Sequence, residues 1–465
     1  MESLVAAQER PDRSRPPLPG PPAALDLPTI QKQSLPNGLA VWVVERHEVP
    51  VVQLSLLVRA GAGQDPAGKA GAASLTAAML DEGAGARSAL EIADAAEFLG
   101  AALTTASSFD ASAVRLNVPV QRLAEGLPLL ADVALRPTFP EKELERLRQE
   151  RLTLLLQVRD DAASVAGMVF SRLVYGPGHR YGTGTIGTET SLKTLTAADL
   201  RAFHAAYFQP SNATLLVVGD ISASGVMPVL RSAFADWRGR SARGPTPLAA
   251  PRPPDQAEIV IVDKPDAEQS QIRIGSVGVP RSTPDYFPLL VLNTILGGAF
   301  TSRLNQNLRE EHGYAYGASS GFDMRLGPGP FYAAAGVQTD KTADALREFF
   351  KELNGIRQPV GVEELAKARN YIALAFPGEF ETTTDLSRRL EELIVYRLPD
   401  DYFERYIANV MAVTAAQVQR AAETYIQPSR FIVVIVGDRK TIEPGVRALE
   451  LAPVRALSID EALQP

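Results

Sequence analysis

The stretch YFQPSNATLLVVGD, Tyr207 to Asp220, recurs as YIQPSRFIVVIVGD at Tyr425 to Asp438, and this repetition decides the fold. Matching Thr-Ala-Ala segments precede the two copies, at Thr196 and Thr414, with the same offset along the sequence as the copies themselves. Each copy predicts a capped helix, a Gln-Pro-Ser stop and a continuously apolar strand buried on both faces. A register held over so long a match indicates one structural unit used twice.

The segment between the two copies, 238–256, is rich in Pro, Gly and Arg and has no periodicity, which predicts a linker. We therefore predict an α+β fold of two homologous domains, each a mixed or antiparallel β-sheet packed with helices. A cleft between two such halves is the default binding site. The predicted boundaries are a Pro-rich disordered leader at 1–28, a first domain at 29–238, a linker at 239–256, a second domain at 257–450 and a C-terminal tail at 451–465.

The beginning of the first half predicts strands and then helices. An Asn37-Gly38 turn precedes one β-rich strand and the His47-Glu48 turn precedes another, so this segment is expected to form a hairpin. A helix is expected from about Ala67 to Leu80. The sequence SALEIADAAEFLG, Ser88 to Gly100, predicts a capped amphipathic helix that closes on glycine.

Composition excludes several classes of function. The chain has 465 residues, too many for one core, and its 45% apolar and 22% charged residues are typical of globular proteins. With a net charge of −7 and no strongly basic stretch, it is not expected to bind nucleic acid. The absence of cysteine excludes disulfides, thiolate zinc sites and cysteine nucleophiles.

No membrane span is expected, because no run approaches the roughly 18 apolar residues that a spanning helix needs. The segment 1–28 lacks the basic and apolar regions of a signal peptide. The sequence leaves the compartment open, with the bacterial periplasm slightly favoured over the cytoplasm if a signal peptide has been removed.

The stretch LGGAFTSRLNQNLREEHGYAY, Leu296 to Tyr316, carries several local signals. Gly297 and Gly298 should end the apolar helix before them, and Thr301 or Ser302 can cap a new helix. Leu304 and Leu308 lie four positions apart and should face inward together. Gly313 should stop this helix, since glycine adopts the left-handed conformation at low cost.

Arg309 and Tyr316 lie on opposite sides of this predicted helix-to-strand turn, close enough to point the same way. On spacing alone, Arg309 could equally pair with Glu310 or Asp323, and Tyr316 could fill a core. The two residues are therefore candidates for a site, with a structural role as the alternative.

Several segments resemble one known family. In the second half these are LNTILGGAFTSRLNQNLREEHGYAYG and FDMRLGPGPFYAAAGVQTDKT, and in the first half they are LPNGLAVWVVE, DPAGKAG and HRYGTGTIGT. The family that they resemble is that of the pitrilysin-like, or inverted zinc-motif, metallopeptidases. The resemblance covers nearly the whole chain, from Ser34 to Asp438. More narrowly, the chain resembles the non-zinc-binding subunits that carry an Arg/Tyr pair in bacterial heterodimeric peptidases, and the alpha-type chains of the mitochondrial processing peptidase.

The family signature is His-x-x-Glu-His on a helix with a distal Glu; two imidazoles and the distal carboxylate hold zinc, and the motif Glu is the general base. Here Ser74 and Ala78 occupy the histidine positions and Ala77 the base position. The distal position falls near 153–155, which holds no carboxylate, and Glu150 is the nearest acid. We therefore expect no metal site and no cofactor in this chain, with zinc in a partner subunit.

The chain has four histidines, at 47, 179, 204 and 312, and no two of them lie at helical i, i+4 spacing. His179 lies in the family-like His-x-Tyr-Gly segment, where a structural role is expected. His312 follows two glutamates at a helix end, where a cation is stabilised by the helix dipole. Structural roles are expected for all four.

The resemblance implies that Arg309 and Tyr316 match the family pair that reaches the substrate backbone and the developing oxyanion. We predict a subunit that is inactive alone and belongs to a heteromeric zinc metalloendopeptidase cleaving peptides or unfolded segments, with a homologous partner that carries His-x-x-Glu-His. The alternatives are a structural or scaffold subunit, and a peptide-binding module, neither with a proteolytic role.

The substrate is expected to bind by adding a strand to a sheet edge in the first half. The candidate edge is formed by Thr104, Thr105, Ala106 and Ser107, for which a solvent-facing hairpin is the alternative. The backbone at Gly297 and Gly298 could approach substrate, although a plain helix stop explains both residues as well.

Overall fold

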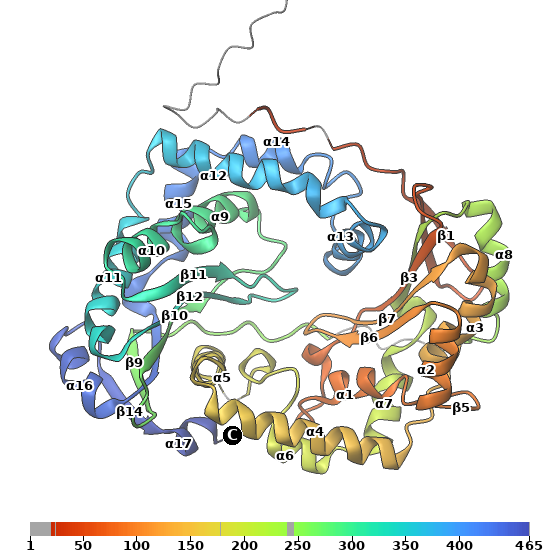
Figure 1. Ribbon diagram of the computed structural model, residues 1–465, viewed down its shortest axis with the longest axis horizontal. Helices are drawn as coiled ribbons and strands as arrows, with labels where there is room; N and C mark the ends of the chain where they lie inside the picture. Colours follow the sequence, from red (N-terminus) through yellow and green to blue (C-terminus); the bar gives the residue numbers. More distant parts are fainter. Residues whose placement is uncertain (1–19, 24, 177, 240–245, 465) are drawn as a thin grey trace, which may run out of the picture.

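A computed structural model describes residues 20–23, 25–176, 178–239 and 246–464 of the protein (Figure 1). Most of the predicted leader at 1–28, and residues 240–245 of the predicted linker, lie outside these ranges. Two six-stranded sheets stand on opposite sides of the molecule, each accompanied by helices. The expected α+β fold of two homologous sheet-and-helix halves is confirmed.

The first sheet has the strand order β1-β2-β8-β3-β7-β6. All neighbouring strands are antiparallel except β2 and β8, which are parallel. Its strands are β1 (Gln31–Ser34), β2 (Ala40–Glu45), β3 (Val51–Val58), β6 (Ala102–Ser107), β7 (Ser112–Pro119) and β8 (Ala213–Gly219), with a separate small pair β4 (Gly83–Ala84) and β5 (Arg87–Ser88).

The second sheet repeats this arrangement, with the order β11-β12-β10-β13-β9-β14. β2 begins at Ala40 and β9 at Glu258, and β7 begins at Ser112 and β12 at Pro330, so both pairs keep the offset that separates Tyr207 from Tyr425 in the sequence repeat. The strands are β9 (Glu258–Asp263), β10 (Gln269–Val277), β11 (Ala315–Phe322), β12 (Pro330–Gln338), β13 (Ile432–Gly437) and β14 (Val454–Ser458).

Two sequence-based expectations about these sheets are wrong. β2 and β3 do not form a hairpin, because β8 lies between them and pairs with both; the hairpin at Asn37-Gly38 joins β1 to β2 instead. β8 is apolar on both faces, and a strand of this kind is buried on both faces when it lies in the middle of a sheet. The expected tail at 451–465 is also structured: β14 pairs in parallel with β9, and Ile459–Leu463 forms a helix.

Several helix ends follow the capping signals of the sequence. Ser88 and Glu91 form a reciprocal capping box, and so do Thr196 and Thr414 with the residues three positions later. The helices are α1 (Ala72–Met79), α2 (Ala89–Phe98), α3 (Leu123–Leu135), α4 (Glu141–Asp160), α5 (Ala162–Tyr175), α6 (Glu189–Thr194), α7 (Ala197–Tyr207), α8 (Ala223–Ala233), α9 (Tyr286–Asn293), α10 (Arg303–Asn305), α11 (Thr342–Gly355), α12 (Val362–Ala375), α13 (Thr383–Tyr396), α14 (Tyr406–Met411), α15 (Ala415–Tyr425), α16 (Arg439–Ala448) and α17 (Ile459–Leu463).

The two halves exchange equivalent helices. α5, from the first half of the sequence, packs on β10 and β13 of the second sheet, while α13, from the second half, packs on β3 and β8 of the first (Figure 1). β13 explains why, since its Val433 and Ile435 point into one core cluster while Ile432, Val434 and Val436 point into another. A strand that is apolar on both faces needs a cover on each, and the second cover comes from the other half.

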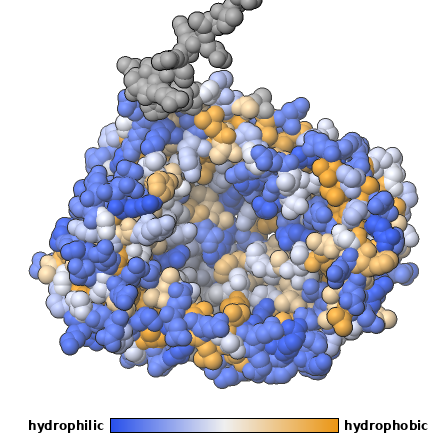
Figure 2. Space-filling model, viewed as in Figure 1, coloured by the Kyte–Doolittle hydropathy of each residue, from blue (hydrophilic) through white to orange (hydrophobic). Residues whose placement is uncertain are grey.

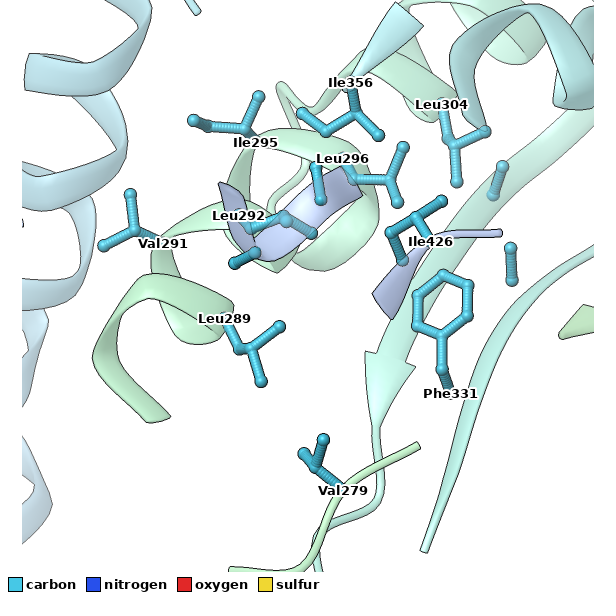
Figure 3. Packing of buried hydrophobic residues seen from close by; sticks show 14 of the residues in the cluster. Val279, Leu289, Val291, Leu292, Ile295, Leu296, Leu304, Phe331, Ile356 and Ile426 are labelled. Carbon is cyan, nitrogen blue, oxygen red and sulfur yellow. The ribbon is translucent and has the colours of Figure 1, made fainter. Parts of the chain in front are cut away.

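The core of the second half surrounds the apolar segment that begins at α9. Thr294–Gly298 continues α9 as a short π-helix, η5. Figure 3 shows side chains of this segment gathered with others from distant parts of the chain, namely Leu289, Val291, Leu292, Ile295, Leu296, Leu304, Phe331, Ile356 and Ile426. This packing fixes the start of the candidate stretch Leu296 to Tyr316.

The 26 residues Tyr286–Glu311 are long enough to cross a membrane, and the most apolar 18-residue window within them has a mean hydropathy of 1.2. However, 61% of the apolar window in this segment is buried inside the protein. A core helix passes the same test, so this segment is weak evidence for a membrane span.

An ion pair ties α13 to the first sheet. Arg115 on β7 donates from Nε to Glu391 Oε1 at 2.8 Å and from Nη2 to Oε2 at 2.5 Å. The Glu391 side chain is 10% exposed, and this pairing raises the pKa of Arg115 above its usual value. The bidentate geometry compensates both groups for their loss of water.

We expect Glu391→Ala to lower the free energy of unfolding by about 2–4 kcal/mol, because it leaves a part-buried guanidinium without its partner. Chemical denaturation measures the change, with Trp42 and Trp237 reporting on the first half. Glu404→Ala, at an exposed position, is the control and should change stability by less than about 0.5 kcal/mol. Equal stabilities of the two variants would contradict the role assigned to the pair.

Candidate functional site

The stretch Leu296 to Tyr316 folds largely as its local signals predict. η5 ends at Gly298, and Leu304 and Leu308 are fully buried. Gly313 has φ +64°, the left-handed conformation expected of a helix stop. Ser302 takes the N-cap position of α10, but its hydroxyl makes no capping hydrogen bond.

The helix that carries Arg309 is not a plain α-helix. Gln306–Glu311 forms a second π-helix, η6, directly after α10. On the other side of Gly313, β11 shifts register between Ala315 and Ala318, which leaves one extra residue against β12. π-helical turns and β-bulges both re-aim side chains and occur often at functional sites.

These two irregular elements bring Arg309 and Tyr316 together. The Arg309 guanidinium carbon lies 5.3 Å from the centre of the Tyr316 ring and 4.5 Å from that of Phe300. Tyr316 is 89% exposed and Phe300 is 58% exposed, so neither ring fills a core. Arg309 Nε lies 3.4 Å from a carboxylate oxygen of Glu310, while Asp323 pairs with Arg325 instead.

The guanidinium is therefore held between two exposed aromatic rings at the edge strand of the second sheet, a cation–π arrangement. Among the described residues, the Tyr316 hydroxyl makes no hydrogen bond within this chain, and Glu310 supplies the ion pair of Arg309. The phenol and the planar five-donor guanidinium can thus both donate to an anionic oxygen of another molecule.

The paired glycines lie beside this cluster and differ in their environment. A Cβ atom at Gly297 would lie 2.4 Å from the Ser320 backbone nitrogen, so close packing against β11 requires glycine there. Gly297 is buried, whereas Gly298 is exposed. Only the Gly298 backbone can therefore be approached from outside.

The positions of the zinc motif lie on α1, where Ala77 is buried and Ser74 and Ala78 are partly exposed. Ser74 Oγ donates to the Thr185 carbonyl at 2.7 Å. Arg151 on α4 donates from Nη1 to Ser74 Oγ and from Nη2 to the Ser74 carbonyl, both at 2.9 Å. The motif helix thus faces a cation.

The residues near the distal position also lack a metal ligand. Leu155 packs partly buried against the first core, and the Thr153 hydroxyl donates to the Gln149 carbonyl. Glu150 is exposed and pairs with Arg146 at 2.7 Å. A hydroxyl, two methyl groups and a guanidinium do not fit a zinc ion, which needs imidazole, thiolate or carboxylate donors.

The four histidines occur in separate environments. His47 lies 2.7 Å from Asp220, His179 Nε2 lies 2.9 Å from the Ala249 carbonyl oxygen, and His312 stacks on Tyr314. His204 is mostly buried and its Nε2 lies 2.9 Å from the Ala134 carbonyl oxygen. Within the described ranges, no three His, Asp or Glu side chains are grouped so that they could hold a metal ion.

Burial lowers the pKa of His204 below its usual value of 6.5. In the unfolded chain this imidazole is protonated near pH 6.5, whereas in the folded protein it is protonated only at lower pH. His204 therefore lowers the free energy of unfolding as the pH falls below 6.5. We expect His204→Gln, which keeps a donor for Ala134, to flatten the fall in melting temperature between pH 6.5 and 5. Melting curves of both proteins test this, and parallel pH profiles would contradict it.

The candidate peptide-binding edge, β6, lies at one edge of the first sheet. β6 pairs only with β7 among the described strands and is the last strand of the first sheet. Thr104 and Ala106 are exposed, whereas Thr105 and Ser107 on the opposite face are partly buried. β6 also contacts α1, so this edge adjoins the helix with the altered zinc motif.

Two family models match the chain. "Insulinase (Peptidase family M16)" matches residues 41–172, and "Peptidase M16 inactive domain" matches residues 194–372. The chain belongs to the M16 family of metallopeptidases. The first match contains Ser74, Ala77 and Ala78, and the second contains Arg309 and Tyr316.

Curated M16 relatives include an uncharacterized zinc protease of Mycobacterium tuberculosis, 28% identical over 71% of this chain and 74% of that protein. Zinc protease PqqE of Helicobacter pylori is 25% identical over 79% of this chain and 84% of its own length. A solved structure described as a peptidase M16 inactive domain from Pseudomonas fluorescens is 27% identical, covers 88% of this chain and 98% of that one, and has a TM-score of 0.82.

A second solved structure, a protease from Helicobacter pylori, has a TM-score of 0.79 at 22% identity, covers 88% of this chain and 100% of that one, and shows the shared fold.

Sequence reasoning missed two residues in this M16 chain. Phe300 follows the two glycines and is not part of a helical or strand pattern in the sequence. Its contact with Arg309 depends on the turn at 299–302. Arg151 stands among many charged residues of α4, and only the packing of α4 beside α1 reveals its contact with Ser74. The nearness of Arg151 to the distal position was the one available hint.

Proposed function

We propose that this chain is the non-metal-binding subunit of a heteromeric zinc metallopeptidase and supplies Arg309 and Tyr316 to a zinc site held by a homologous partner. The observation that carries the proposal is the exposed pairing of these two side chains, with 5.3 Å between guanidinium and ring, in a chain whose zinc motif has lost its ligands. Packing within this chain does not explain why an 89% exposed tyrosine adjoins a partly buried arginine.

The chemistry of the pair fits the hydrolysis of a peptide bond. Negative charge develops on the carbonyl oxygen of the peptide in the transition state, and fixed donors aimed at that oxygen lower the barrier. Arg309 offers a rigid fork and Tyr316 a phenol, both held on irregular elements at the margin of the core. Zinc in the partner supplies Lewis-acid chemistry; this chain supplies orientation and charge.

The shape of the molecule supports this division. Figure 2 shows that the viewed face is hollowed at its middle, between the two halves. In Figure 1, β6 and β11, one edge strand from each sheet, both border this middle region. We propose that β6 receives an extended peptide by strand addition through Thr104 to Ser107, and that the Gly298 backbone lies along the same path.

We expect Arg309→Lys and Tyr316→Phe each to lower kcat of the mixed complex by roughly 10²-fold to 10³-fold, because each removes a donor to the developing oxyanion. The assay mixes this chain with a partner that carries His-x-x-Glu-His and follows the cleavage of an unstructured peptide. Tyr371→Phe, at a 54% exposed tyrosine on α12, is the matched control and should leave turnover unchanged.

Assembly of the mixed complex is measured in parallel by size-exclusion chromatography, so a loss of turnover is not confused with a loss of binding. Unchanged hydrolysis in both variants would favour the scaffold role. Peptide affinity without cleavage in any pairing would instead favour the peptide-binding module.

Phe300 provides a further prediction about this pair. Its ring lies 4.5 Å from the Arg309 guanidinium, so it should restrict the guanidinium to one orientation. Phe300→Leu should lower kcat of the mixed complex by about tenfold, since a mispositioned donor loses part of its effect. Phe300→Tyr keeps the aromatic face and should retain most of the activity; equal losses in the two variants would contradict this.

A further inference from the structure

The strongest unexplained feature outside the Arg309 cluster is the cation at the altered zinc motif. Arg151 donates two hydrogen bonds to Ser74, one to Oγ and one to the main-chain carbonyl, each at 2.9 Å. Ser74 Oγ in turn donates to the Thr185 carbonyl at 2.7 Å. One guanidinium therefore connects α4, α1 and the segment around Thr185.

This cation belongs to a group of charges withdrawn from water. Asp65, 6% exposed, accepts hydrogen bonds at 2.7 Å from the amides of Gly71 and Ala73 at the start of α1, and it pairs with Arg180 at 3.0 Å. Burial lowers the pKa of Arg151 to about 10, and the charge of Asp65 opposes that fall. Arg151 therefore remains a cation at neutral pH.

The internal repeat shows that this contact is specific to the first half. Arg369 is the counterpart of Arg151 at the offset of the repeat, but its Nη1 donates to the carbonyls of Met411 and Val413, at the end of α14. In the first half, the equivalent contact is made by Arg148, whose Nη2 donates to the Leu195 carbonyl at the end of α6 at 2.8 Å. Arg148 and Arg369 thus share one structural role, and Arg151 has another.

The counterpart of Ser74 at the same offset is Leu292, which is fully buried among apolar side chains. Within the described part of the second half, Arg369 makes no contact with Leu292 that resembles the one between Arg151 and Ser74. The contact occurs only in the half that carries the zinc-motif positions. The shared fold therefore does not require it.

We propose that Arg151 replaces the metal of the family site: its guanidinium provides the positive charge that ties α1 to α4, and it excludes a divalent cation from the space between them. Two like charges a few Å apart repel strongly at a site withdrawn from water. Arginine suits this role because it stays protonated and offers several donors in a fixed plane. The motif therefore carries an internal cation where active relatives would carry zinc.

This inference concerns the chain alone and does not depend on the proposed partner. Restoring the ligands in two backgrounds tests it. One variant carries Ser74→His, Ala77→Glu, Ala78→His and Leu155→Glu with Arg151 kept; the other carries the same four changes and Arg151→Gln. Zinc per chain is measured by elemental analysis after dialysis, and affinity by titration against a chelator.

We expect one zinc per chain only in the variant with Arg151→Gln, with an affinity at least on the order of 100-fold above that of the variant that keeps Arg151. Equal zinc binding by both variants, or binding by neither, would overturn the exclusion of metal by Arg151. Circular dichroism establishes that both variants are folded before zinc is added.

The tie between the helices is tested without metal in the otherwise natural chain. Arg151→Met should raise the hydrogen-exchange rate of amides in α1 by at least about tenfold, while those of α9 and η5 in the second half stay unchanged. Lys142→Met is the control on α4, because the Lys142 side chain is 93% exposed and lies 4.0 Å from Glu143 on the same helix. Unchanged exchange in α1 in the Arg151→Met protein would overturn the structural part of the proposal.

Discussion

The structure depends on the reciprocal covering of two sheets by exchanged helices. β8 and β13 are apolar on both faces, and one face of each strand packs against a helix from the other half. α13 closes this face of the first sheet, and α5 closes that of the second. Exposing either face would leave a large apolar surface in water, so burial of these faces holds the halves together.

This exchange determines where functional residues can lie. With much of both sheet faces covered, the sheets remain open at their edge strands, which are β1 and β6 in the first sheet and β11 and β14 in the second. Arg309 and Tyr316 lie near β11, on a π-helix and beside a bulge, and Phe300 contacts Arg309 from the turn at 299–302. A rigid core with irregular backbone at its margin is the usual way to hold donors in a fixed direction.

The altered zinc motif and the Arg309 cluster differ in how their arginine side chains are bonded. At the motif, Arg151 is withdrawn from solvent and directed into the chain, where Ser74 accepts both of its hydrogen bonds. At the edge of the second sheet, Arg309 is held between exposed rings. The first arrangement satisfies a cation internally, and the second leaves a cation available. The contrast distinguishes a cation whose donors bond within the chain from a cation that lies beside two exposed rings.

The sequence by itself determined the repeat, the capped helices, the glycine stop at Gly313, the nearness of Arg309 to Tyr316 and the absence of His and Glu at positions 74, 77 and 78. Each of these depends on local spacing or residue type. Only the tertiary structure decided that β8 separates β2 from β3, that β14 completes the second sheet, that the halves exchange α5 and α13, and that Arg151 faces Ser74. These features join residues distant in the chain. Their partners are selected by the burial of apolar faces and by the charges left inside, which periodicity does not record.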